Sequence, residues 1–79
     1  MNMETEMTTF IPVSSKAVGK TIKDIESFGV KVGHYYLTPA TFNQHYKPEP
    51  NIELKAGMGI NITGQRTKIH NLCNALGLP

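Results

Sequence analysis

The last third of the chain carries the pattern that most limits the possible folds. Residues 57–64, GMGINITG, alternate Met58, Ile60 and Ile62 with small or polar residues, which predicts a half-buried strand. The period then changes to that of a helix, and four side chains recur at i, i+3, i+4 and i+7 to form one apolar stripe (Ile69, Leu72, Cys73 and Leu76). Gly77 is placed to end that helix. A strand with one buried face, followed by a helix with one buried stripe, predicts a sheet with helices on one side.

Further strands are expected in the first half of the chain. Thr8–Val13 is β-branched and aromatic, and Pro12 within it indicates an edge or an end of a sheet. Val30–Leu37 has strand composition again. The segment after it is broken by prolines and has room for one short strand around Phe42–Tyr46; the prolines are Pro39, Pro48 and Pro50.

A first helix is expected after residues 14–21, SSKAVGKT, whose final GKT matches the end of a phosphate-binding P-loop. That loop needs a glycine five residues before its second glycine, and Ser14 stands there instead. The same letters fit a loop over 14–19 that leads into a helix capped by Thr21 and Asp24 and ended by Gly29. One apolar stripe marks this helix (Ile22, Ile25 and Phe28). A helix start is therefore predicted.

The elements together predict an α+β fold in the order β-α-β-β-β-α, with an antiparallel-rich sheet and two helices. Residues 1–7 are polar and unpatterned, and we expect them to be a disordered leader, with residues 8–79 forming one domain. A chain of 79 residues that is 39% hydrophobic is near the lower size limit for a self-sufficient core. A second copy that completes the interior is therefore expected.

Charge and cysteine content narrow the functional classes. The formal net charge is +2, well short of a nucleic-acid-binding surface, and the lysines around the first helix are mixed with Asp24 and Glu26. Cys73 is the single cysteine, which excludes an internal disulfide and fits a reducing compartment. The sequence shows no apolar run of about 20 residues and no signal peptide. A soluble, cytoplasmic chain is expected, either separate or as the soluble part of a membrane protein.

The most unusual local cluster lies in the second strand. Strand alternation predicts that His34 and Tyr36 share one face with Val32, while Tyr35 shares the other with Gly33. In one interpretation His34 and Tyr36 are polar-tipped walls of a ligand cleft. In the other, the aromatic rings simply pack and leave their polar tips at the rim.

In the ligand interpretation Asn43 and Gln44 face the strand as adaptable hydrogen-bond partners. No metal site is expected, because the three histidines have no spacing typical of metal ligands and no acidic pairs accompany them (His34, His45 and His70). His45 and His70 are expected to be solvated. Cys73 lies on the apolar stripe of the last helix and is interpreted as a core residue. No catalytic set of nucleophile, base and orienting group is visible, so no enzyme and no cofactor are predicted.

From Phe10 to Gly77 the sequence resembles a TrkA-C domain, the C-terminal regulatory module of RCK (regulator of potassium conductance) proteins. The resemblance lies in residues 17–32, AVGKTIKDIESFGVKV, and in residues 52–77, IELKAGMGINITGQRTKIHNLCNALG. The matching positions are Gly19, Lys20, Thr21, Ile22, Ile25, Val30, Val32, Pro48, Leu54, Gly57, Ile60, Ile62 and Gly64. Two positions depart from the family pattern: Met58 replaces an aspartate, and Leu37 replaces a basic residue found in many members.

The resemblance implies a small TrkA-C-like module that forms a homodimer on the cytoplasmic side of potassium channels or other ion transporters. In several such domains a small ligand, cyclic di-AMP among them, lies in the cleft between the two copies. Leu37 weakens the expectation of a dianionic dinucleotide here, because phosphate recognition favours an arginine fork.

We therefore expect a non-catalytic regulatory domain that senses a small molecule and modulates a potassium or other ion transporter or channel. The expected ligand-binding residues are Val32, His34, Tyr36, Asn43 and Gln44. The main alternative is a stand-alone dimerisation or protein-interaction module that binds no metabolite. A small RNA-binding module ranks below both, and nucleic acid is not an expected partner.

Overall fold

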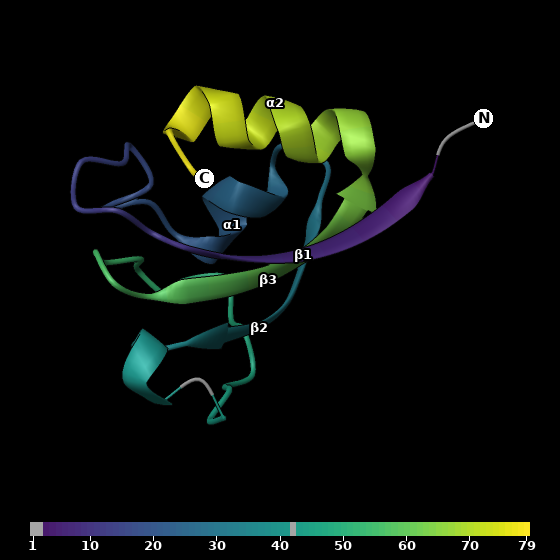
Figure 1. The fold of residues 1–79 in the computed structure, drawn as a ribbon. Helices are drawn as coiled ribbons and strands as arrows, with labels where there is room; N and C mark the ends of the chain where they lie inside the picture. The colour runs from purple at the N-terminus through teal and green to yellow at the C-terminus, as the bar shows by residue number, and fades with distance from the viewer. Residues whose placement is uncertain (1–2, 42) are drawn as a thin grey trace.

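The computed structural model describes residues 3–41 and 43–79, and over these residues the fold is α+β (Figure 1). Its elements are, in chain order, β1 (Glu4–Phe10), α1 (Ile22–Glu26), β2 (Lys31–Tyr36), the 3-10 turn η1 (Pro39–Thr41), β3 (Gly59–Gln65) and α2 (Arg66–Leu76). Both α-helices lie on the same side of the sheet in Figure 1. This arrangement confirms the predicted fold class.

β3 lies at the centre of the sheet, in the order β1-β3-β2, and both neighbours run antiparallel to it. The alternation that predicted this strand is present: Ile60 and Ile62 are fully buried toward the helices. Met7 of β1 lies opposite Ile62, and so does Val32 of β2, so the three strands bury side chains on one face. That face and the two helices enclose the hydrophobic core, which includes Ile22, Ile25, Leu54, Ile60, Ile62, Ile69, Leu72 and Leu76.

The first strand differs from its prediction. It begins at Glu4 rather than Thr8, and it pairs with β3 from Glu4↔Gln65 to Phe10↔Gly59. Residues 4–7 therefore belong to the sheet and not to a leader, while residues 1–2 lie outside the described part of the chain. The sequence hides this because Glu4, Thr5 and Glu6 have polar side chains, and the ladder is made by backbone groups of any residue type.

The strand expected around Phe42–Tyr46 is also different. Phe42 lies outside the described residues, so that part of the prediction has no structural counterpart here. Tyr46 forms an isolated bridge with Tyr35, with backbone N···O distances of 3.1 and 2.8 Å. Among the described residues this is a single bridge at the outer side of β2 and not a fourth strand.

Helix α1 begins as predicted. Thr21 is its N-cap, and a capping box joins Thr21 to Asp24: the Thr21 N–H donates to Asp24 Oδ2 at 2.9 Å, and the Asp24 N–H donates to Thr21 Oγ1 at 3.3 Å. Carbonyl groups of residues 50–54 accept further backbone N–H groups near the helix start: the Ile22 N–H donates to the Ile52 carbonyl at 3.0 Å, and the Lys23 N–H to the Pro50 carbonyl at 3.1 Å. Gly29, with φ of +89°, ends the turn after the helix. The GKT letters are therefore a helix start.

The capping box predicts a specific acid sensitivity. The hydrogen bond from the Thr21 backbone, followed by that from its side chain, holds the pKa of the Asp24 carboxyl below its usual value. A lowered folded-state pKa contributes stability above the unfolded pKa of about 4, and the contribution is lost as the pH falls through the lower folded value. We expect the free energies of unfolding of the wild type and Asp24→Asn, measured with urea, to differ at pH 7. The difference is expected to shrink as the pH falls below about 4. A difference that is the same at every pH would contradict this prediction.

Helix α2 follows β3 without a loop and ends at Gly77, whose φ of +68° and ψ of +45° confirm the predicted left-handed cap. Ile69, Leu72 and Leu76 are buried against the sheet, and Cys73 is half-buried beside them. Neither α-helix in the described part of the chain combines the length and apolarity that crossing a membrane requires.

Candidate functional site

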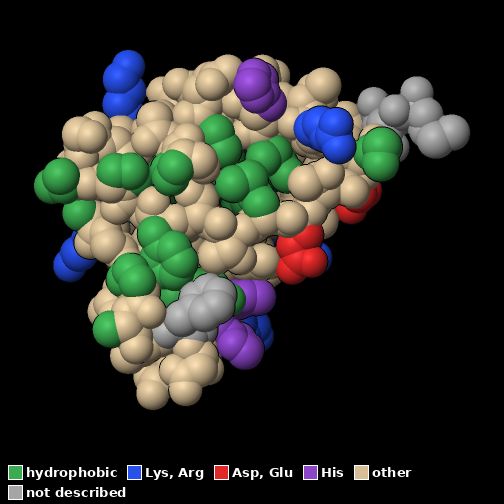
Figure 2. All heavy atoms as spheres, in the orientation of Figure 1, with side chains coloured by type: hydrophobic (Ala, Val, Ile, Leu, Met, Phe, Trp, Pro, Cys, Tyr) green, Lys and Arg blue, Asp and Glu red, His purple; other side chains and the backbone are tan. Residues whose placement is uncertain are grey.

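The sheet has a second face, turned away from the helices, which we call the open face. Residues paired directly across an antiparallel ladder point to the same side, so the register assigns its members. They are Glu4, Glu6, Thr8 and Phe10 of β1, Gly59, Asn61, Thr63 and Gln65 of β3, and Lys31, His34 and Tyr36 of β2. A group of histidine side chains is visible on the side of the molecule away from the helices (Figure 2).

A β-bulge in β2 changes the predicted arrangement of side chains. Val32 pairs with Ile62 and His34 with Asn61, so Gly33 is an extra residue without a pairing partner in the ladder. The bulge breaks the simple alternation: His34 and Tyr36 lie on the open face, whereas Val32 lies on the core face with 2% of its surface exposed. The prediction that Val32 shares a face with His34 and Tyr36 is therefore wrong. Tyr35 packs against the core, on the same side as Val32.

His34 and Tyr36 are the centre of a small group of rings, which we call the aromatic cluster (Phe10, His34, Tyr36 and His45). His34 Nε2 and the Tyr36 hydroxyl are 2.8 Å apart and share a hydrogen bond. The ring centroids of Phe10 and Tyr36 are 5.9 Å apart, and those of His34 and His45 are 4.7 Å apart. Three segments distant in sequence thus meet on the open face: the end of β1, β2, and the loop before Tyr46.

Gly59 makes room for the cluster. It is buried in β3 opposite Phe10, and a Cβ added there would lie 2.5 Å from Cε2 of the Phe10 ring. Because real Cβ contacts do not come so close, the Phe10 ring can lie over β3 only above a residue without a side chain. Gly59 and Phe10 therefore form a matched pair, and sequence patterning alone missed it.

Asn61 provides the polar part of the open face beside the cluster. Its side chain is 6% exposed, and Nδ2 donates to Glu6 Oε2 at 2.9 Å and to Thr8 Oγ1 at 3.2 Å. The carboxylate of Glu6 is therefore held in place across the ladder. Asn61 and Tyr36 are buried supports of this face, and the accessible groups beside them are the rings of His34 and His45 and the carboxylate of Glu6. Rings combined with polar groups are typical of small-molecule sites.

The remaining predicted ligand residues lie close in sequence to the cluster. Asn43 and Gln44 are exposed in the loop before His45. His45 was expected to be solvated. It is exposed, but its ring also packs against His34, so it is the member of the loop that the structure brings to the cluster. Nothing in the local sequence signals this, because it depends on the fold of the proline-rich segment.

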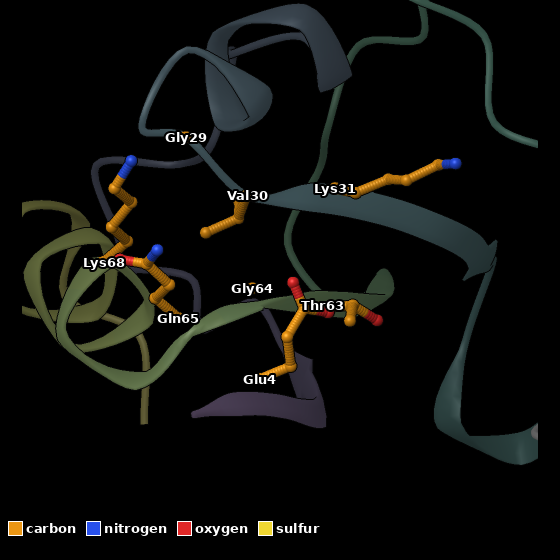
Figure 3. Close-up of a pocket in the computed structure, with 8 residues that line it drawn as sticks. All are labelled: Glu4, Gly29, Val30, Lys31, Thr63, Gly64, Gln65 and Lys68. Carbon is orange, nitrogen blue, oxygen red and sulfur yellow. The ribbon is translucent and has the colours of Figure 1, made fainter. Parts of the chain in front are cut away.

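A separate cavity of about 300 Å³ lies at the other end of the sheet, between the start of β2 and the start of α2 (Figure 3). Its lining includes Glu4, Lys31 and Lys68, together with backbone at Gly29 and Gly64. In Figure 3 Lys68 extends toward Gly29, whereas Lys31 extends away from the cavity. One acidic and two basic side chains at an open rim give this cavity no clear preference for a ligand charge.

The other residues considered for chemistry lie apart from both places. His70 and Asn74, exposed on α2, contact one another at 3.0 Å. Burial raises the pKa of the Cys73 thiol, which lowers its thiolate fraction and its reactivity. No group of three or more histidine, cysteine or acidic side chains that could hold a metal ion occurs over residues 3–41 and 43–79.

Comparison with protein-family models gives no match for this chain, and no curated protein matches it.

Proposed function

We propose that this chain is a non-catalytic regulatory domain of the cytoplasm that dimerises, binds a small ligand and modulates a potassium or other ion transporter or channel. The observation that carries the ligand-binding part is the aromatic cluster on the open face. The link to ion transport is drawn from the resemblance to TrkA-C domains. Regulation would follow from linkage: a ligand that binds one arrangement of the dimer more tightly shifts the coupled transporter by that difference in affinity.

The chemistry of the cluster favours a ligand with a planar ring. The exposed ring of His45 and the half-buried ring of His34 offer ring surface, and the exposed carboxylate of Glu6 offers a hydrogen-bond acceptor near them. Tyr36, 7% exposed, holds His34 in place through their shared hydrogen bond. Aromatic side chains stack on nucleobases without any need for phosphate contacts. A nucleobase-containing metabolite such as a cyclic dinucleotide or a nucleoside fits this surface, and Leu37 and the acidic Glu6 make the base a better recognition element than the phosphates.

A thermal-shift series tests this function. Cyclic di-AMP, AMP and adenosine are titrated against the full chain, and a ligand that binds the folded state raises the Tm as its concentration increases. At a hundredfold excess over Kd the expected rise is at least about 10 °C for a domain of this size. His34→Ala is expected to weaken binding about tenfold, because it removes the ring and its hydrogen bond to Tyr36.

His70→Ala is the matched control, since it removes an exposed histidine from α2 and leaves the open face intact. A shift that is equally reduced by both variants would place the ligand elsewhere. A chain that dimerises but shows no shift with any of the three probes would favour the alternative, a stand-alone dimerisation or protein-interaction module. Exposed apolar side chains such as Val13 and Leu37, 84% and 47% exposed, are the observation in favour of that alternative.

A further inference from the structure

The two margins of the sheet differ in how their backbone groups are used. Hydrogen bonds flank the ladder between β1 and β3 at both ends. The Arg66 N–H donates to the Met3 carbonyl at 3.2 Å, and the Ile11 N–H donates to the Met58 carbonyl at 2.8 Å. Backbone groups alternate in direction along a strand. Thr5, Met7 and Thr9 therefore turn their N–H and C=O groups toward β3, as Met3 and Ile11 do. The even-numbered residues turn theirs outward.

At the β2 margin the outward groups are already bonded within the chain. The Val32 N–H donates to Glu26 Oε2 at 2.9 Å, so a side chain of α1 covers the first part of this strand. Tyr35 exchanges backbone hydrogen bonds with Tyr46, which covers the second part. The bulge at Gly33 interrupts the strand between these two points. These are devices by which proteins keep a sheet margin from pairing with another chain.

The β1 margin carries none of these devices. The outward N–H and C=O groups of Glu4, Glu6 and Thr8 have no hydrogen-bond partner among the residues that the structure describes. The strand is seven residues long and pairs with β3 in an uninterrupted register. It contains neither lysine nor proline, and its charged residues, Glu4 and Glu6, lie in its first half. A long, regular and uncovered margin of this kind is a template for another strand.

We propose that two copies of this chain pair antiparallel through β1, with the Met7 residues facing one another on the two-fold axis. The proposal rests on the proposed function in that it specifies how the regulatory dimer forms. A residue whose backbone groups point outward must pair with a partner residue whose groups also point outward. Glu6 therefore exchanges two backbone hydrogen bonds with the partner's Thr8, and the two-fold symmetry creates the same pair between Thr8 and the partner's Glu6. Glu4 then faces the partner's Phe10.

Charge disfavours one of the two neighbouring registers, and the smaller number of paired residues disfavours both. If β1 slipped by two residues toward its start, Glu6 would lie directly opposite the partner's Glu6, and like charges in that position are destabilising. In the centred register each glutamate faces an uncharged residue. All seven residues of the strand are also paired, whereas any slip leaves some of them without a partner. Phe10 belongs both to this margin and to the aromatic cluster, so the pairing brings the partner's Glu4 beside the cluster, whereas His34 and Tyr36 lie on β2 at the other margin.

Disulfide trapping tests the register directly. In a Cys73→Ala background the variant Met7→Cys places its cysteines in a non-hydrogen-bonded pair, whose Cα atoms lie about 4.5 Å apart, within the range that a disulfide spans. The matched control Thr5→Cys lies on the same face of β1, but its symmetry mate is offset by four residues, or about 14 Å. Under mild oxidation by copper phenanthroline we expect at least a tenfold greater dimer yield for Met7→Cys, as read on a non-reducing gel.

A second pair of variants does not depend on trapping. Glu6→Pro removes an outward N–H without breaking the ladder to β3, while Glu6→Ala keeps that N–H; both lose the bond from Asn61. Sedimentation equilibrium is expected to show a dimer Kd at least tenfold weaker for Glu6→Pro than for Glu6→Ala, with unfolding midpoints at low concentration that agree. Equal dimerisation of these two variants overturns pairing through β1.

The outcomes separate this proposal from the function on which it rests. A dimer that forms normally in Glu6→Pro, or that traps at Thr5→Cys instead, rejects the β1 register while ligand sensing stands. A dimer that traps at Met7→Cys without any ligand response in the thermal-shift series supports the pairing and rejects ligand sensing. A chain that stays monomeric at millimolar concentration rejects the pairing.

Discussion

Leu72→Ala is expected to lower the free energy of unfolding by about 2–5 kcal/mol, the usual result of truncating a buried leucine. Leu72 is fully buried in the core, on the face of α2 that covers the sheet. Domains of this size are stable by only about 5–15 kcal/mol, so the variant loses much of its folded population. Urea unfolding followed by circular dichroism at several protein concentrations measures the loss and separates it from any change in dimerisation.

Leu37→Ala is the control for this prediction. Leu37 is 47% exposed at the end of β2, and its truncation is expected to change the free energy of unfolding by no more than about 0.5 kcal/mol. If both leucine variants unfolded at the same urea concentration, the packing of α2 on the sheet would differ from that described above.

Gly59→Ala is expected to cost about 1–3 kcal/mol, as overpacking at a well-packed site usually does. The new Cβ would lie 2.5 Å from the Phe10 ring, so either β3 shifts or Phe10 leaves the sheet. Displacement of the ring would open the aromatic cluster, because the Phe10 and Tyr36 centroids are only 5.9 Å apart. Urea unfolding measures the cost, and the ring-current shifts of Tyr36 in the NMR spectrum report the movement.

A double-mutant cycle shows whether the ring is the cause. In a Phe10→Ala background the cost of Gly59→Ala is expected to fall close to zero, since the clashing atoms are gone. Gly19→Ala provides the contrast: open space surrounds its Cβ, but φ is +90°, so its cost comes from backbone strain and stays the same in the Phe10→Ala background. A cost at Gly59 that persists without Phe10 would contradict the steric explanation.

The features that local sequence determines were predictable. The Thr21–Asp24 capping box depends on residues three positions apart, and the Gly77 cap depends on a residue that tolerates a positive φ. The alternation of Ile60 and Ile62 also survives, because a central strand with one covered face must bury every second side chain. These rules act over a few residues, so they gave the order of the helices and of β1, β2 and β3, but they also predicted a strand around Phe42–Tyr46 where the described residues form only a bridge at Tyr46.

The features that depend on distant partners were not predictable. In the sequence Gly33 looks like an ordinary strand residue. In the structure it forms a bulge that places Val32 on the opposite face from His34, and no pattern within β2 predicts that bulge. His45 reaches His34 only because the segment after β2 folds back along that strand. The candidate site was therefore half predicted: His34 and Tyr36 came from composition, whereas Phe10, His45 and Gly59 came from tertiary contacts.

The hydrogen bonds at Val32 and Tyr35 also limit how far these chains can polymerise. A sheet that can add strands at both sides recruits copy after copy and grows into a fibre. Here Glu26 and Tyr46 bond the outward backbone groups of β2. A dimer formed through β1 would therefore present only covered β2 margins, to which a third chain could not add a strand. Under the proposed pairing through β1, assembly would therefore end at two chains.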